Sequence, residues 1–156
     1  MWEEKDILII IKTYPEISIR HTETVCTGGI LAENMKMVRL YPIPFRYLDG
    51  DQQFKIFQWL RAKIRKNTRD SRPESYNIDD KSIQLRHTIS SRDWNERRKW
   101  VLSESNIYKS LEAIKSANEQ YGTSMGIIKP KKIEDFRILN RSDTDQREID
   151  TKKNQS

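Results

Sequence analysis

The sequence predicts an α+β protein that is rich in β-strands and carries two helices toward its C-terminal end. Short β-branched segments and alternating apolar segments dominate residues 6–89. Two segments with the apolar spacing of amphipathic helices follow. A chain of 156 residues can bury one core without disulfides or metals. We therefore predict a single β-rich domain over residues 1–140. A disordered tail or linker is predicted over residues 141–156, where apolar side chains are almost absent.

The first three predicted strands lie near the N-terminus. Residues 6–14 (DILIIIKTY) form a short β-branched run that ends at a proline, which is typical of a strand buried on both faces. Residues 22–31 and 36–42 flank a short polar loop and predict a hairpin. Gly28 and Gly29 inside the first hairpin strand indicate a bulge or a close approach of two backbones.

The predicted function depends on the conformation of residues 58–66. On a helix, their apolar side chains would spread around the whole surface. On a strand they alternate, so that Leu60, Ala62 and Ile64 share one face and mainly basic residues occupy the other. We therefore predict a strand here, and a further strand at residues 82–89 after a turn-rich segment.

Two helices and two short strands complete the predicted domain. A capping-box pattern begins the first helix at Asp93, and residues 105–121 carry an apolar stripe that ends at Gly122. Residues 125–128 and 133–139 predict the last two strands. This order of elements fits a small OB-like or Greek-key barrel. It fits equally a curved sheet with the C-terminal helix pair packed on it.

The excess positive charge of the chain is concentrated in one segment. The protein has 29 lysines and arginines against 23 aspartates and glutamates, a net charge of +6. Residues 55–72 contain seven basic residues and a single acidic one, Asp70, so the rest of the chain is balanced. Such a segment predicts a docking surface for an anionic partner. We expect this partner to be nucleic acid, either DNA or RNA, with an acidic protein as the second candidate.

The predicted docking surface is the basic face of the strand at residues 58–66. Side chains two positions apart on a strand lie about 7 Å apart, close to the phosphate spacing of an extended single strand. The residues expected to hold phosphates are Arg61, Lys63, Arg65 and Arg72. The residues expected to orient bases or to stack on them are Arg39, Tyr41, Arg46 and Trp59. The alternative interpretation is an ordinary solvated sheet face, on which lysine and arginine are common.

Two further clusters have both a functional and a structural interpretation. Residues 94–100 (WNERRKW) place three basic residues between two tryptophans. A helix there would present cations to phosphates, or its tryptophans would anchor it to the sheet. Glu74, Asp79 and Asp80 lie near Lys81 and are the residue types of a metal-dependent nuclease, although carboxylates in such a stretch are usually turn formers and caps.

The remaining residues indicate no catalytic group, cofactor or metal site. His21 and His87, the two histidines, lack ligand spacing. The one cysteine, Cys26, lies inside a predicted strand, where we expect a small buried side chain without a disulfide, as in a reducing cytosol. The longest apolar run, residues 7–11, is too short for a membrane span or a signal sequence. We expect a cytoplasmic protein with no membrane partner.

The hairpin region has a recognisable pattern at residues 23–46 (ETVCTGGILAENMKMVRLYPIPFR). A strand with Cys and Gly is followed by a loop and by a strand that ends in Arg-x-x-Pro, here Arg39 and Pro42. This pattern resembles the start of the dual OB-containing domains, an uncharacterised family of bacterial proteins, some linked to defence or conflict loci. That family has an aromatic residue before the arginine, where this chain has Val38. The resemblance implies OB-like strands and a role in recognising nucleic acid or another ligand, without catalytic residues.

The sequence thus predicts a non-enzymatic nucleic-acid-binding module that uses a basic sheet face, with single strands as the candidate ligand. The resemblance extends this to a component of a bacterial defence or conflict system. A protein-interaction or ligand-sensor subunit that docks on an acidic partner is the first alternative. A metal-dependent nuclease is the second.

Overall fold

Five strands of the protein close into a barrel. The computed structural model describes residues 1–13, 16–17, 23–44, 48, 50 and 53–136. The barrel strands are β1 (Glu3–Lys12), β3 (Glu23–Leu31), β4 (Met37–Ile43), β5 (Gln58–Lys66) and β6 (Ser75–Ile78). The predicted β-rich α+β class is therefore confirmed.

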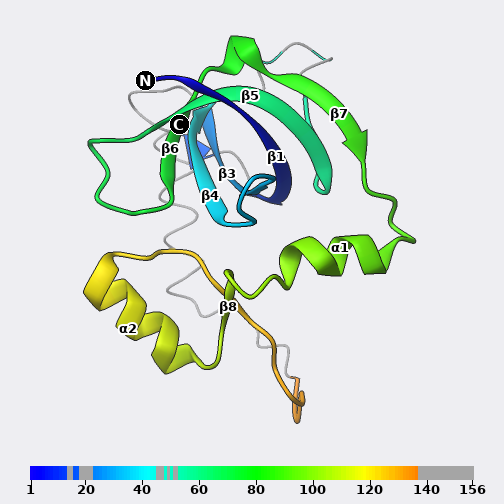
Figure 1. Cartoon of the computed structure of the whole chain (residues 1–156), viewed down its shortest axis with the longest axis vertical. Helices are drawn as coiled ribbons and strands as arrows, with labels where there is room; N and C mark the ends of the chain where they lie inside the picture. The colour runs from blue at the N-terminus through cyan, green and yellow to red at the C-terminus, as the bar shows by residue number, and fades with distance from the viewer. Residues whose placement is uncertain (14–15, 18–22, 45–47, 49, 51–52, 137–156) are drawn as a thin grey trace.

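The strand order around the barrel is β1, β3, β4, β6, β5 and back to β1 (Figure 1). All neighbours are antiparallel except β4 and β6, which run parallel. β2 (Glu16–Ile17) extends the pairing of β3, and β7 (Gln84–Thr88) pairs with the first half of β5 outside the closed cycle. Closure leaves each of the five barrel strands with a neighbour on both edges.

The barrel interior is filled by alternating side chains of the five strands. Leu60, Ala62 and Ile64 of β5 are at most 1% exposed and face inward, as the strand prediction for this segment requires. Ile7 and Ile9 of β1 join the same buried cluster. These positions repeat every second residue, so the core directly reflects the two-residue period of the sequence.

A second buried cluster lies on the outside of the barrel. It contains Leu8, Ile30, Trp59 and Ile89, and Trp100 packs against it. The ring centroids of Trp59 and Trp100 are 4.8 Å apart in an edge-to-face arrangement. Because β1 contributes to both clusters, it is buried on both faces, as predicted.

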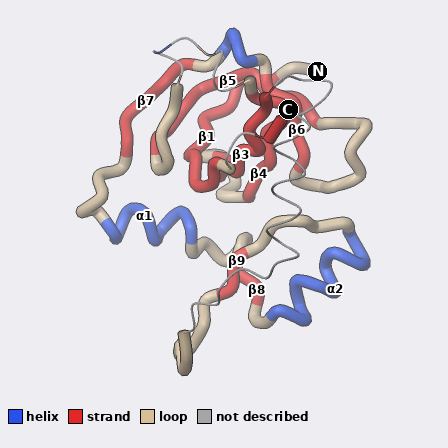
Figure 2. The backbone as a smooth tube through the Cα atoms, turned by 180° about the vertical axis from the view of Figure 1, so that it is seen from behind, coloured by secondary structure: helices blue, strands red, loops and turns tan. Residues whose placement is uncertain are grey.

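The two helices lie apart rather than side by side (Figures 1 and 2). Helix α1 (Trp94–Val101) begins where the Asp93 carboxylate accepts a hydrogen bond from the Glu96 amide, which confirms the predicted cap. Helix α2 (Leu111–Tyr121) ends at Gly122, whose φ of 72° is the left-handed conformation expected of a C-terminal glycine. Neither helix is long and apolar enough to cross a membrane, within the part of the chain that the structure describes.

Four elements differ from the sequence prediction. β6 occupies residues that were predicted as a turn. Ile107 and Tyr108 were assigned to a helix but form β8, which pairs in parallel with β9 (Ile127–Ile128). Helix α2 starts later than predicted because the Ser110 hydroxyl caps it by accepting from the Ala113 amide. Residues 133–136 form no strand, and residues 137–139 lie outside the described chain.

Gly29 allows β1 and β3 to approach closely. A Cβ at this position would lie 2.5 Å from Cγ2 of Ile7 and 3.1 Å from the carbonyl oxygen of Leu8. The pairing of β1 with β3 also shifts register between Ile9 and Ile11, opposite the glycines. Both features that the Gly-Gly pair predicted are present.

We expect Gly29→Ala to lower the free energy of unfolding by about 1–3 kcal/mol, because the added methyl group overpacks a rigid core position. Urea denaturation measures the change. The matched control is Gly50→Ala, since no atom lies within 4 Å of the Cβ position of Gly50; its effect should stay within about 0.5 kcal/mol. Equal denaturation midpoints for the two variants would contradict the predicted contact.

Candidate nucleic-acid interface

The outer face of β5 does not form the predicted row of free cations. The register of β1 and β5 places Asp6 opposite Arg61 and Glu4 opposite Lys63. The Nε and Nη2 atoms of Arg61 donate to the two carboxylate oxygens of Asp6 at 2.8 and 2.6 Å. Opposite charges that face each other across two strands stabilise the pairing and neutralise one another. Arg61 is thus occupied by an internal ion pair.

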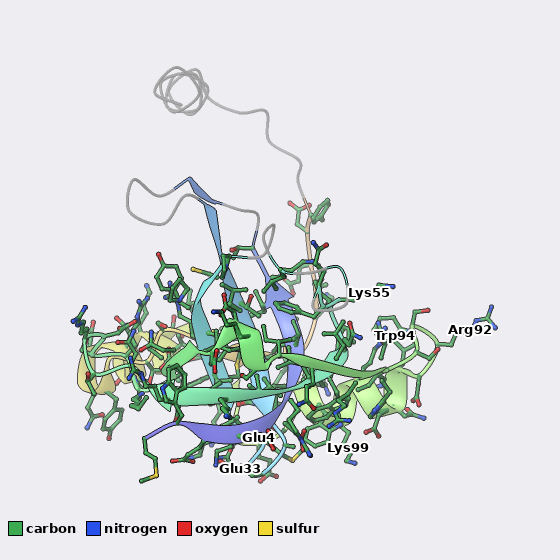
Figure 3. The ribbon with its side chains drawn as sticks, turned by 90° about the horizontal axis from the view of Figure 1, so that it is seen from above. Glu4, Glu33, Lys55, Arg92, Trp94 and Lys99 are labelled. Atoms are coloured by element: carbon green, nitrogen blue, oxygen red, sulfur yellow. The ribbon has the colours of Figure 1, made fainter. Side chains whose placement is uncertain are left out.

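The acidic side chains of β1 and the neighbouring β3–β4 loop extend this charge pairing. The Nζ atom of Lys5 lies 2.9 Å from a carboxylate oxygen of Glu3 and 2.7 Å from one of Glu33. Figure 3 shows Glu4 and Glu33 together beside β1. The hydrogen bond from Arg61 holds the pKa of Asp6 below its ordinary value, although partial burial opposes the shift. This surface therefore presents mixed charge to an incoming anion.

Trp59 lies on the outer face of β5 as expected, but it is covered. Its side chain is packed against Trp100 and the residue is only 8% exposed, so the expectation that it stacks on a base is wrong. Arg65 is exposed and its guanidinium carbon lies 4.7 Å from the ring centroid of Trp2. Lys63 is exposed. Only these two cations of the predicted row remain accessible without an ion pair among the described residues.

A groove of about 1110 Å³ lies instead over the outer face of β3 and β4. Its floor includes Cys26, Gly28, Arg39 and Tyr41, because alternate residues of the two strands face outward here. One wall is the β5–β6 loop, residues 67–72. The other boundaries are Ile11, Thr13, Ser124 and Met125. The groove therefore gathers segments that are far apart in the sequence.

The groove brings together three of the predicted site residues, namely Arg39, Tyr41 and Arg72. It adds Arg69, which was counted in the basic segment but was not expected at the site. Arg46 lies outside the described residues. Arg69 belongs to the basic segment at residues 55–72, so the sequence indicated its charge. Its place in the groove depends on the conformation of the loop that joins β5 to β6.

Gly28 places no side chain in the groove. It lies opposite Arg39 in the pairing of β3 with β4. A Cβ at this position would lie 3.1 Å from Cβ of Ile11, tighter than most real contacts. The glycine therefore leaves room for the side chain of Ile11, its partner on β1.

The β5–β6 loop is fixed by a charged hydrogen-bond network. The Nε and Nη2 atoms of Arg72 donate to the carboxylate of Asp70 at 2.8 and 2.7 Å, and the Ser75 hydroxyl donates to the same carboxylate. The Nζ atom of Lys66 donates to the carbonyl oxygens of Arg72 and Pro73. Burial of the ammonium group lowers the pKa of Lys66, against the opposing attraction of nearby carboxylates. Arg72 therefore serves mainly to hold the wall of the groove in place.

The remaining groove cations have no carboxylate partner in the described part of the chain. The Nη2 atom of Arg39 donates to the sulfur of Cys26 at 3.4 Å. The backbone amide of Arg69 donates to the Asn67 side chain, while the exposed guanidinium makes no ion pair there. Cys26 is half-buried at the groove floor, and so it is more accessible than the small buried side chain expected from the sequence. Because Asp70 is paired with Arg72, the open surface of the groove is positive.

The carboxylates that suggested a nuclease do not converge. One carboxylate oxygen of the buried Glu74 accepts hydrogen bonds from the amide and the hydroxyl of Ser124. Asp79 and Asp80 lie at the start of a short 3₁₀ helix, and a carboxylate oxygen of Asp80 accepts from the Lys81 amide. Among the described residues, no group of three histidine, cysteine or acidic side chains is placed to hold a metal ion. This arrangement gives the nuclease alternative no support.

Helix α1 is anchored to the barrel by Trp100 and Arg97. The guanidinium carbon of Arg97 lies 4.1 Å from the ring centroid of Phe57, and its Nη2 atom donates to the carbonyl oxygen of Ile89. Trp94 is 64% exposed and does not anchor the helix, in contrast to the structural interpretation of both tryptophans. Figure 3 shows Trp94 and Arg92 at the same outer edge of the molecule.

The chain resembles one known protein family over most of its length. Residues 3–103 match the family described as Domain of unknown function (DUF8758). The chain belongs to this family. The DUF8758 match includes the five barrel strands and α1, and it ends before β8, α2 and β9. The groove floor and the β5–β6 loop therefore lie inside the DUF8758 match, whereas Ser124 and Met125 lie outside it. Neither the curated proteins nor the solved structures gave a match.

We expect Asp6→Asn to lower the free energy of unfolding by less than about 1 kcal/mol near pH 7, since both partners of the Asp6–Arg61 pair are 39% exposed. The pKa of Asp6 in the folded protein lies below its ordinary value of 3.8. The stabilisation is therefore present above that value and is lost as the pH falls through the lowered pKa. Urea denaturation from about pH 7 to about pH 2 should show the difference between the two proteins shrink.

The control for this pH dependence is Glu134→Gln, which removes an ion pair of Lys132 that is almost fully solvated. We expect no pH-dependent difference for this variant. A difference between wild type and Asp6→Asn that stays constant down to the lowest pH would show that the carboxylate does not titrate as a paired group.

Proposed function

We propose that this DUF8758 protein binds single-stranded nucleic acid in the groove over β3 and β4. The observation that carries the proposal is the position of the groove on the barrel. β3 and β4 are the second and third barrel strands, and residues 67–72 lie in the loop between the fourth and fifth. In OB-folds, the face of the second and third strands and the loops after the first and fourth strands bind oligonucleotides.

The strand order supports an OB-like assignment of the barrel. Counted in chain order, the barrel strands follow the sequence first, second, third, fifth, fourth, and the third and fifth are parallel. This connectivity supports the assignment to a five-stranded Greek-key barrel of the OB type. The assignment agrees with the resemblance of residues 23–46 to the dual OB-containing domains. The role in a bacterial defence system that this resemblance implies stays a prediction.

The side chains of the groove suit a flexible polyanion. Arg39 and Arg69 offer guanidinium groups to phosphates, and Tyr41 offers a ring on which a base can stack. An open groove admits successive nucleotides, whereas the covered Trp59 and the paired Arg61 cannot contribute. The binding surface we propose is therefore adjacent to the predicted one, and it retains Arg39, Tyr41 and Arg72 from it.

Salt dependence tests the proposal. Two to three phosphate contacts on a single strand predict a slope of log K against log salt between roughly −1.4 and −2.1. Fluorescence anisotropy with a labelled single-stranded oligonucleotide measures this slope. Binding that does not depend on salt, or no binding at low salt, would disprove the proposal. Equal binding to polyglutamate would favour the alternative of an acidic protein partner.

We expect Arg39→Ala and Arg69→Ala each to reduce the magnitude of the salt slope by about 0.7, because each removes one phosphate contact. Tyr41→Ala should weaken binding by about 1–3 kcal/mol with little change in slope, because it removes a stacking platform rather than a charge. The matched control is Lys63→Ala, which removes the same charge from the exposed face of β5 outside the groove. A reduction in slope for Lys63→Ala as large as for Arg69→Ala would move the site back to β5.

A further inference from the structure

A second hollow lies between one end of the barrel and the segments that follow α1. Its volume is about 430 Å³, within the range of small-molecule pockets. The barrel contributes Leu31, Val38 and Tyr76, and the C-terminal segments contribute Tyr108 and Met125. Figures 1 and 2 show β8 beside α2 and below the barrel. Met125 lines this pocket and the nucleic-acid groove, so the two hollows share one wall.

Two hydrogen-bonded anchors hold the walls of the pocket in place. The buried Asn106 side chain donates to the carbonyl oxygen of Met35 at 2.7 Å and accepts from the amide of Met37 at 3.1 Å. On the opposite side, the Ser124 amide donates to Oε1 of Glu74 at 2.6 Å. Anchors on both sides make the pocket preformed, so a ligand need not order its walls.

The pocket combines aromatic rings with one cation and one carboxylate. Tyr76 and Tyr108 are half-buried, and Lys66 covers one face of Tyr76 with its Nζ atom 5.0 Å from the ring centroid. Lys36 is exposed at the rim, with no ion pair of its Nζ atom in the described chain. The Oε2 atom of Glu74 has no hydrogen-bond partner among the described residues, although Oε1 is occupied. These groups favour a planar ligand that carries both an amino group and an anion.

We propose that this pocket binds a mononucleotide whose base carries an exocyclic amino group. The base lies against the side chains of Tyr108 and Tyr76, which both line the pocket. The amino group donates to Oε2 of Glu74, and the phosphate pairs with Lys36. Carboxylates accept hydrogen bonds from such amino groups in base recognition. The site shares the wall at Met125 with the groove but uses none of the groove arginines.

The test compares adenosine, cytidine, guanosine and uridine monophosphates by isothermal titration calorimetry on the full chain. Uridine lacks the amino group and should bind roughly tenfold more weakly than the other three, the cost of one hydrogen bond to a charged group. Inorganic phosphate alone should show no binding in the same range. Failure of all four nucleotides to bind at about 1 mM, or binding of uridine monophosphate as tight as that of the others, would overturn the proposal.

The variant Glu74→Gln tests the role of the Glu74 carboxylate in base recognition. The amide keeps an acceptor for Ser124 and turns the other atom into a donor, so the preference should shift toward uridine, whose carbonyl oxygen can accept. Urea denaturation establishes that the variant is folded. An unchanged order of nucleotide affinities in a folded Glu74→Gln protein would contradict the role of the carboxylate.

Lys36→Ala serves as the second variant, since an exposed lysine can be replaced without loss of the fold. It should weaken the binding of adenosine monophosphate about tenfold and leave that of adenosine unchanged. Lys63→Ala is the charge-matched control and should change neither. Arg69→Ala should weaken oligonucleotide binding but leave mononucleotide binding intact, so that failure of either site is distinguishable from failure of the other.

Discussion

The antiparallel pairing of β1 with β5 closes the barrel, and the rest of the structure depends on it. The two strands pair from Glu3 with Ile64 to Leu8 with Trp59. Ile7 and Leu60 meet in the core, while Asp6 and Arg61 meet on the outside as a charged pair. Because closure gives every barrel strand two neighbours, it also satisfies the backbone groups that an open sheet would expose. One register therefore sets the core, the surface charge and the ends of the barrel together.

This register divides the outside of the barrel into three regions. Along β1 and β5, acidic and basic side chains face each other and cancel. At one end of the same strands, Trp59 and Leu8 are covered by Trp100 of α1. The outer face of β3 and β4 is left open above Gly28, with the β5–β6 loop beside it. Lys63 and Arg65 thus remain accessible on β5, whereas the cations of the groove lie on β4 and in the β5–β6 loop.

Local alternation predicted the strands that have strong two-residue periods. Residues 58–66 were assigned correctly because three apolar residues alternate with polar ones, and the hairpin of β3 and β4 followed from two apolar segments around a polar loop. β6 was missed because its four residues have no such period and are specified by pairing with β4 and β5. β8 was missed because Ile107 and Tyr108 fit the helical stripe and are drawn into a strand only by Ile127 and Ile128.

The sequence by itself determined the β-rich class, the bulge and close backbone approach at Gly28 and Gly29, the caps at Asp93 and Gly122, and the segment that holds the excess positive charge. These features depend on neighbours within a few residues or on composition, which the chain carries locally. Only the tertiary structure decided which cations remain accessible. Arg61 is paired with Asp6, which lies fifty-five positions away in the sequence. Arg39, Arg69 and Tyr41 line one groove. Coulombic pairing and burial act between residues that are close in space, and that closeness is fixed by the strand register rather than by the local sequence.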